Sequence, residues 1–169
     1  KLKAEKEIKK FEHLAEYGIE YRAPFDASST DFQNSSIDAC ISTDTLEHIP
    51  KEDIIKILNE LYRVLKPKGI VSAFIDYTDH YAHTDSSISN LNYLMFSDSQ
   101  WKKYNHRVHF QNRMRHYDYL NIFDDCGFKI IEEEVIYGED NFPVKIADKF
   151  ANKPKTVYAT AAYVVLKKK

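Results

Sequence analysis

The stretch Ser36-Ile37-Asp38-Ala39-Cys40-Ile41-Ser42-Thr43-Asp44-Thr45-Leu46-Glu47-His48-Ile49-Pro50 decides the fold of this chain. Its apolar part, residues 37–42, predicts a buried strand, and the polar residues after it predict a loop at the carboxyl end of that strand. Open α/β sheets bind their ligands at such strand ends. A functional site is therefore expected in and around residues 42–48.

A helix and a second strand follow this stretch. The helix, expected over residues 51–65, is indicated by apolar residues at helical spacing, namely Ile54, Leu58, Leu61 and Leu65. The turn Lys66-Pro67-Lys68-Gly69 ends it, and glycine suits a left-handed helix end. Residues 70–75 are apolar on both faces, which is typical of a central strand in a covered sheet.

The flanking sequence extends the α/β pattern on both sides. Helices are expected over Leu2–Tyr17, Val144–Phe150 and Tyr117–Cys126, and strands over Ile19–Ala23, Phe128–Tyr137 and Thr156–Leu166. The two last strands predict an antiparallel hairpin. Residues 76–116 have no sustained period and are rich in His, Tyr, Asp, Ser and Asn, so they predict a long insertion or lid.

Composition limits the class of protein. A chain of 169 residues with 43% hydrophobic and 30% charged residues is expected to form a globular domain with a sizeable core. Its net charge of −2 and dispersed basic residues argue against a nucleic-acid partner. Cys40 and Cys126 make no disulfide framework, and no apolar run has the length of a membrane span. We therefore expect a cytoplasmic protein without a membrane partner.

From Ser36 to Gly69 the sequence resembles the middle of class I S-adenosylmethionine-dependent methyltransferases. The matching features are an aspartate that opens the strand, the Leu46-Glu47-His48 triplet, and a helix that ends in Arg63-Val64-Leu65-Lys66-Pro67-Lys68-Gly69. The resemblance implies a partial Rossmann-like methyltransferase sheet, α/β in class, that ends in an antiparallel hairpin. It also implies S-adenosylmethionine as cofactor and methyl transfer to a small-molecule acceptor.

The resemblance assigns cofactor contacts to two loops. Asp26 matches the acidic position after the third strand of the family, where a carboxylate accepts a hydrogen bond from the adenine amino group, and Ala27 beside it offers backbone contacts. Ser42, Thr43 and Leu46 match the loop that passes the methionine end of the cofactor. Without the resemblance, Asp26 would be interpreted as a turn residue.

The glycine-rich first turn of the family, and the acidic residue that binds the ribose, would lie before Lys1. The chain has only four glycines, and none of them is left over for a phosphate-cradling loop. We therefore expect residues 1–169 to be a single partial methyltransferase domain from a longer protein. Such a fragment alone is expected to bind the cofactor poorly or not at all.

Methyl transfer is an in-line displacement, so the protein mainly positions the two reactants and supplies a base for the proton of the acceptor. The candidates for this catalytic role are His80, His48 and Glu47, because histidine titrates near neutral pH and these residues follow strand ends. Within the predicted lid, the candidate substrate contacts are Tyr81, His83 and Arg113. The guanidinium of Arg113 suits a carboxylate or phosphate, with an ordinary basic turn as the other interpretation.

Two other functions stay open from the sequence. One is a non-catalytic domain that binds a partner and has kept the fold. The other is a metal-dependent hydrolase built on Asp79, His80, His83 and Asp85, whose residue types suit a divalent ion. Because their spacing matches no specific metal motif, no metal ligand is assigned.

Overall fold

The structure is a computed structural model that describes residues 11–138 and 145–169. The strands are β1 (Ile37–Thr43), β2 (Leu65–Asp76), β3 (Phe128–Ile136) and β4 (Ala161–Lys168), and the α-helices are α1 (Lys51–Val64), α2 (Asp98–Trp101) and α3 (His116–Asp125). Short 3-10 helices are η1 (Phe11–Tyr17), η2 (Leu46–His48), η3 (His80–His83), η4 (Asn92–Met95), η5 (Arg107–His109), η6 (Asp148–Phe150) and η7 (Lys155–Tyr158).

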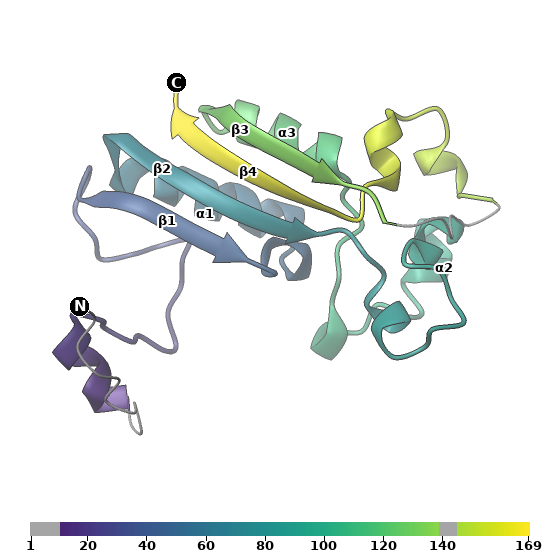
Figure 1. Cartoon of the computed structure of the whole chain (residues 1–169), viewed down its shortest axis with the longest axis horizontal. Coiled ribbons are helices and arrows are strands. Elements are labelled where there is room, and N and C mark those ends of the chain that lie inside the picture. Colours follow the sequence, from purple (N-terminus) through teal and green to yellow (C-terminus); the bar gives the residue numbers. More distant parts are fainter. Residues whose placement is uncertain (1–10, 139–144) are drawn as a thin grey trace, which may run out of the picture.

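The strands form a mixed sheet in the order β1-β2-β4-β3 (Figure 1). Strands β1 and β2 are parallel, with Cys40 opposite Val71, and their connection runs through α1. Strand β4 is antiparallel to both of its neighbours, β2 and β3. The parallel pair and the C-terminal antiparallel hairpin are thus confirmed.

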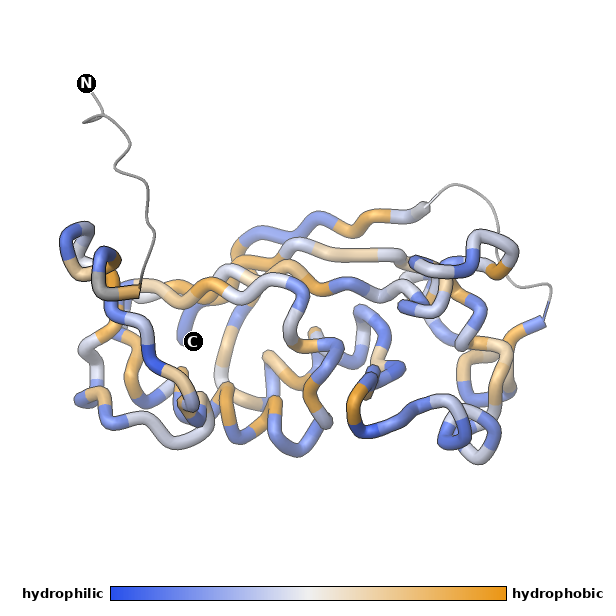
Figure 2. The backbone as a smooth tube through the Cα atoms, turned by 90° about the horizontal axis from the view of Figure 1, so that it is seen from below, coloured by the Kyte–Doolittle hydropathy of each residue, from blue (hydrophilic) through white to orange (hydrophobic). Residues whose placement is uncertain are grey.

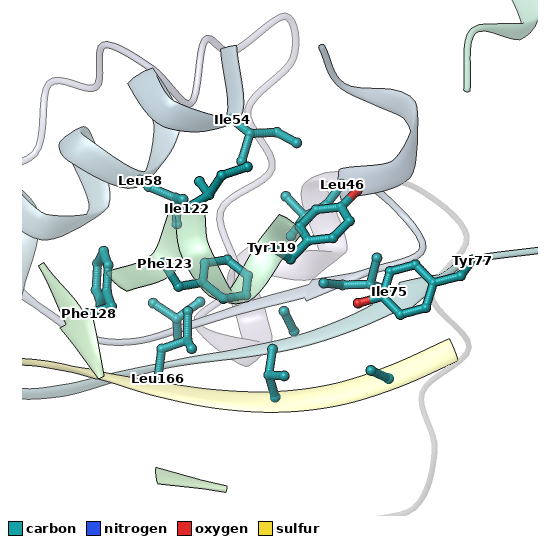
Figure 3. Close-up of a cluster of buried hydrophobic side chains, with 14 of the residues drawn as sticks. Leu46, Ile54, Leu58, Ile75, Tyr77, Tyr119, Ile122, Phe123, Phe128 and Leu166 are labelled. Carbon is teal, nitrogen blue, oxygen red and sulfur yellow. The ribbon is translucent and has the colours of Figure 1, made fainter. Parts of the chain in front are cut away.

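Helices α1 and α3 lie on the same face of the sheet, so their apolar sides and that face share one core (Figures 1 and 2). Along β2 the odd-numbered residues from Val71 to Ile75 are buried and the even-numbered ones are half-buried, as expected of alternating strand faces. The largest cluster of buried side chains includes Leu58 and Phe123 from the two helices and Leu166 from β4 (Figure 3). This core holds β1 and β2 in register and so fixes the edge where both strands end.

Residues 76–116 pack around a second, smaller core. Instead of one long helix they form η3, η4, α2 and η5, which agrees with their lack of a sustained period. The buried members of this core are Leu91, Tyr93, Leu94, Trp101, Phe150 and Val157. Since Phe150 and Val157 come from the segment before β4, the predicted lid is anchored to the C-terminal part of the chain.

The buried side chain of Arg115 ties these parts together. Its guanidinium donates to the carbonyl oxygens of Tyr77, Val157 and Ala159 and to the hydroxyl of Tyr93. The donors of one side chain thus satisfy three backbone carbonyls from two segments, which would be costly to leave without partners.

The N-terminal part differs from the expectation. Residues 19–23, predicted as a strand, form no strand in the structure and are exposed, because no described strand lies beside them to accept their backbone hydrogen bonds. Of the helix predicted over Leu2–Tyr17, only η1 falls within the described residues, and Val144 of the predicted helix 144–150 lies outside them.

The last strand begins at Ala161 rather than at Thr156, since η7 occupies the residues before it.

Two of the glycines that were expected at helix ends have the backbone conformation of such an end, and a third does not. Gly18 and Gly127 have φ of +72° and +85°, as a left-handed helix end requires. Gly69, expected to play the same role, lies instead within β2. There an added Cβ would lie 2.8 Å from Leu65 Cδ2 and 3.0 Å from the carbonyl oxygen of Asp38, so that Gly69 is needed for the close approach of β1 and β2.

Within the described residues, no helix combines the length and the apolar character needed to cross a membrane. Cys40 and Cys126 are both free and half-buried, and burial raises the pKa of each thiol. Neither is therefore activated as a nucleophile.

Candidate functional site

The site lies at the edge of the sheet where the parallel strands β1 and β2 end. After β1 the chain turns at Asp44, whose φ of +47° is in the left-handed region that non-glycine residues seldom adopt. The Asp44 amide donates to the carbonyl oxygen of Phe74 in β2 at 3.3 Å. This turn directs the chain into η2, so that Glu47 and His48 lie close to the residues that follow β2.

A largely apolar cavity of about 350 Å³ lies on one side of this turn. Four of the five predicted cofactor contacts are among its lining residues, namely Ala27, Ser42, Thr43 and Leu46. The volume falls within the range of small-molecule sites. The structure therefore brings together residues that the sequence separates by almost twenty positions.

The fifth predicted cofactor contact, Asp26, is next to Ala27 in the same loop. Its Oδ1 accepts hydrogen bonds from the backbone amide and hydroxyl of Ser28, at 2.8 and 2.7 Å. The hydroxyl bond is the main reason why the pKa of Asp26 is lowered. The Asp26 carboxylate thus stabilises the turn from which Ala27 reaches the cavity. Both of these hydrogen bonds use Oδ1 of Asp26 and neither uses Oδ2.

The predicted catalytic residues Glu47, His48 and His80 converge on the other side of the turn. One ligand-type atom of each lies within 4.8 Å of those of the other two. The ring centroids of His48 and His80 are 4.8 Å apart. Because η2 follows β1 and η3 follows shortly after β2, the parallel pairing of the strands is what places these side chains together.

Glu47 is buried, with a relative exposed area of 2%. Neither of its carboxylate oxygens has a hydrogen-bond partner among the described residues, and burial raises the pKa of this carboxyl. Nε2 of His80 is also buried without a hydrogen-bond partner within the same ranges. It lies 3.4 Å from Oδ2 of Asp76, whose carboxylate raises the pKa of His80. Buried polar atoms normally have hydrogen-bond partners, so the carboxylate oxygens of Glu47 and Nε2 of His80 mark a candidate functional site.

Two consecutive residues hold the elements that carry this cluster. The side chain of Asn112 donates to the carbonyl oxygens of Leu46 and Ile49, both at 2.8 Å, which fixes η2. The side-chain carbonyl of Gln111 accepts from the amide of His80 at 3.3 Å, which fixes the start of η3. The relative position of η2 and η3 is therefore set by one short segment.

The predicted substrate contacts lie in different places. His83 is exposed, and its ring stacks on that of His80 with 4.9 Å between centroids. The hydroxyl of Tyr81 donates to the carbonyl oxygen of Tyr104, and its ring packs against the second core. Both belong to η3 and so adjoin the cluster.

Arg113 does not join this cluster. Its guanidinium donates to the carbonyl oxygens of Tyr93 and Phe96 and to Oδ1 of Asp98, and its side chain is almost fully buried. It lines a separate cavity of about 280 Å³ together with Lys149. Since these donors already bind groups of the protein, the structure favours a structural role over the expected contact to a carboxylate or phosphate.

The four residues of the alternative metal cluster, Asp79, His80, His83 and Asp85, do not converge on one point. Asp79 caps η3 by accepting from the amide of Tyr81, and Asp85 accepts from the amide and hydroxyl of Ser87. Among the described residues, the groups that could hold a cation are Glu47–His48–His80 and Asp76–His80–His83. A hydrolase built on Asp79 and Asp85 is therefore not favoured.

A third cavity, of about 450 Å³, opens beside His48, and of its lining residues only His48 was named from the sequence as a candidate. Its lining residues are His48, Pro50, Asn105, Arg107 and Phe110. No periodic pattern identifies Asn105, Arg107 and Phe110, because they meet His48 only in the folded protein. The roles of Gln111 and Asn112 likewise appear only in the structure, where their hydrogen bonds reveal what they hold.

Comparisons with known proteins agree with this fold. A family model described as "Methyltransferase domain" matches residues 3–73. No curated protein matches the sequence.

Solved structures match over most of the chain. The protein bound by the Trm112 methyltransferase activator of Haloferax volcanii is 18% identical, with a TM-score of 0.51, and the match covers 85% of this chain and 59% of that one. The [4+2]-cyclase SpnF is 16% identical, with a TM-score of 0.56 and coverages of 94% and 61%. Geranyl diphosphate C-methyltransferase from Streptomyces coelicolor, solved with Mg²⁺, geranyl diphosphate and S-adenosyl-L-homocysteine, is 9% identical, with a TM-score of 0.52 and coverages of 86% and 53%.

These similarities confirm the fold inferred from the segment Ser36 to Gly69. The chain has the Rossmann-like fold of class I methyltransferases, as an open and partial sheet. It spans between 53% and 61% of the length of the three structures above. Since one of them is a cyclase, the fold by itself does not determine the reaction, which depends on the site.

Proposed function

We propose that this chain is part of an enzyme that transfers a methyl group from S-adenosylmethionine to a small-molecule acceptor. The observation that carries the proposal is the juxtaposition of two features at one edge of the sheet. A cavity lined by Ala27, Ser42, Thr43 and Leu46 adjoins the polar cluster of the buried Glu47, the half-buried His80 and the exposed His48. Leu46 and Glu47 are consecutive, so that the cavity and the cluster meet at η2.

The cavity suits the cofactor in size and chemistry. Its walls are apolar except near the end of β1, where Ser42 and Thr43 provide hydroxyl groups and backbone polar groups. An adenosyl group has an apolar face and a polar rim, which match such a lining. The matched family model ends at residue 73 and so includes Ala27 and the whole β1–η2 turn.

The acceptor enters, in this proposal, through the cavity that His48 shares with Asn105, Arg107 and Phe110. A group there lies beside the imidazoles of His48 and His80, either of which can take a proton from a hydroxyl or amine acceptor. His83 and Tyr81, on η3, flank the same side. In the displacement the acceptor atom bonds to the methyl carbon, while the carbon–sulfur bond breaks and its electron pair stays on sulfur.

The role of Arg113 in this proposal is to hold the acceptor side in shape. Its hydrogen bonds join η4 to the N-terminal residue of α2, and both elements belong to the segment 76–116 that we assign to the acceptor. Because this segment has its own packed core, it presents a stable wall. We therefore propose that the predicted lid acts as a fixed acceptor-binding lobe.

The test is isothermal titration of S-adenosylmethionine and S-adenosylhomocysteine into the full-length protein, together with transfer of labelled methyl groups to a panel of small molecules. Ala27→Trp fills the cavity from its loop and is expected to weaken cofactor binding by about tenfold or more. Ser29→Trp, at an exposed position of the same loop that is not among the lining residues, is the matched control. Absence of cofactor binding by the full-length protein would refute the proposal.

Binding without methyl transfer would instead favour the non-catalytic alternative, a domain that keeps the fold and binds a partner. Glu47→Gln and His80→Ala distinguish the two cases. If the chain is catalytic, both changes reduce the transfer rate while cofactor affinity changes little, since neither residue lines the cofactor cavity.

A further inference from the structure

The cluster at the ends of β1 and β2 contains more ionisable side chains than a general base needs. A lone general base needs a single partner, but Glu47, His48 and His80 bring a carboxylate and two imidazoles to one point. The carboxylate of Glu47 is buried with both oxygens unpaired among the described residues. A buried carboxylate without a partner is costly, and either a proton or a bound cation removes that cost. The two imidazoles beside it favour the cation.

We propose that Glu47, His48 and His80 bind a divalent transition-metal cation, with Asp76 beside them as a further oxygen ligand. A carboxylate and two imidazoles suit Zn²⁺, Fe²⁺, Co²⁺, Ni²⁺ and Mn²⁺, whereas Mg²⁺ and Ca²⁺ prefer oxygen ligands throughout.

The hydrogen bond of His48 supports this assignment. Nδ1 of His48 lies 2.9 Å from the carbonyl oxygen of Phe110. A carbonyl oxygen can only accept, so Nδ1 carries the hydrogen and Nε2 is left with a free lone pair. Histidines that bind metals commonly donate their second ring hydrogen to a backbone carbonyl in this way. His48 is thus held in the tautomer that a metal ligand needs.

His80 and Asp76 have compatible spacing. Nε2 of His80, buried and without a hydrogen-bond partner in the described part of the chain, is 3.4 Å from Oδ2 of Asp76. Two ligands bound at about 2.1 Å in a tetrahedral arrangement lie about 3.4 Å apart. The atoms of Glu47, His48 and His80, within 4.8 Å of one another, would approach by at most about 1.4 Å to reach the same spacing.

The neighbouring group Asp76–His80–His83 is the weaker candidate. Nε2 of His83 is already paired with the hydroxyl of Thr78 at 3.0 Å. Oδ1 of Asp76 accepts from the amide of Thr78 at 2.7 Å, which leaves Oδ2 as its free oxygen. His83 is therefore not required as a ligand. Its substitution shows which of the two groups binds the metal, because His83 belongs only to the second group.

A cation at this point would activate the acceptor, a role that rests on the proposed function. Bound to the cation, an acceptor hydroxyl or enol loses its proton more readily, because the positive charge stabilises the resulting oxygen anion. With the imidazoles of His48 and His80 used as ligands, the proton passes to solvent through the cavity beside His48 instead of to either histidine. The oxygen then attacks the methyl carbon as the carbon–sulfur bond breaks. The metal itself binds whether or not a cofactor is present.

The test is a titration of the metal-free, full-length protein with Co²⁺, followed by its visible absorption, with Zn²⁺ as competitor. We expect binding of about one ion per chain, displaced by Zn²⁺ but not by an equal amount of Mg²⁺. Glu47→Gln, His48→Ala and His80→Ala are each expected to weaken Co²⁺ binding by at least about tenfold, since even outer partners of metal sites contribute that much. Far-UV circular dichroism checks that each variant folds.

Two control variants sharpen the result. His106→Ala removes an exposed imidazole outside both groups and should leave Co²⁺ binding unchanged. His83→Ala should also retain it; loss of binding in His83→Ala but not in His48→Ala would overturn the assignment, as would a wild type that binds no Co²⁺. Because no cofactor is present, failure here leaves the titration of S-adenosylmethionine as a separate test of the proposed function.

Discussion

Removal of the side chain of Asn112 should destabilise the protein and loosen the candidate site together. The amide of Asn112 donates to the carbonyl oxygens of Leu46 and Ile49, and its Oδ1 accepts from the Met114 amide at 3.1 Å and the Tyr119 hydroxyl at 3.2 Å. Asn112→Ala loses all of these hydrogen bonds and leaves the buried Tyr119 hydroxyl without its acceptor.

The magnitude follows from those bonds. Each contributes about 0.5–1.5 kcal/mol, and part of the loss is recovered where water reaches the half-buried site, so we expect about 2–4 kcal/mol. For a chain of this length, that loss lowers the melting temperature by about 5–15 °C. Because η2 carries Glu47 and His48, Co²⁺ affinity should fall in the same variant, even though Asn112 is not a ligand.

The assay is chemical denaturation followed by circular dichroism, with the Co²⁺ titration on the folded protein. Asn92→Ala is the matched control, since its side chain makes one described bond, to Oδ2 of Asp79 at 3.2 Å. The control should lose about 1 kcal/mol and keep its Co²⁺ affinity. If Asn112→Ala is as stable as the control and binds Co²⁺ like the wild type, Asn112 does not hold η2.

Four further outcomes are expected from single changes. Glu47→Gln, measured in chelator, should raise the free energy of unfolding by about 1–2 kcal/mol, because a neutral amide costs less to bury than a carboxylate; a loss of stability would contradict the absence of a partner. Arg115→Lys should cost about 3 kcal/mol or more in urea denaturation, since an ammonium cannot reach the same carbonyls, and a cost under 1 kcal/mol would show that it can. Gly69→Ala should cost about 1–3 kcal/mol through overpacking between β1 and β2, and a neutral effect in the same assay would mean that the strands separate freely. Finally, hydrogen bonds led by that from Arg63 lower the pKa of Glu60 from 4.5 to about 2. The contribution of Glu60 to stability is therefore present above pH 4.5 and is lost as the pH falls toward 2. Between these pH values the melting temperature of Glu60→Gln should fall less steeply than that of the wild type, and an equal fall would contradict this pKa.

Much of the fold could be predicted from periodicity, because the elements of the core have strong local patterns. The apolar spacing from Ile54 to Leu65 predicted α1 to within a residue, and the run 70–75 lies within β2. Where the local pattern was weak, prediction failed. Residues 19–23 are β-like in sequence, but a strand exists only when a neighbouring strand takes its hydrogen bonds, and no described strand does so.

For the candidate site, too, local sequence signals identified some residues, while the roles of others became visible only in the tertiary structure. Asp26, Ala27, Ser42, Thr43 and Leu46 were named from a resemblance of residues, and their roles as cofactor contacts stay predictions, although four of them surround one cavity. Glu47, His48 and His80 were named from their positions after strand ends, a local signal that the parallel sheet brings to one edge. For Arg113 the substrate contact stays a prediction: its residue type suggests an anion site, while only the packed structure reveals that backbone carbonyls and Asp98 already bind its guanidinium.

By itself, the stretch from Ser36 to Pro50 determined that a strand ends in a polar turn, since that information is carried by neighbours along the chain. Only the tertiary structure decided what the turn meets. The pairing of β1 with β2 places His80 beside His48, thirty-two positions away, and the bonds of Asn112 hold that arrangement. Burial of Glu47 without a partner is likewise a property of the packed protein, because whether a carboxylate is paired depends on groups that no local sequence pattern specifies.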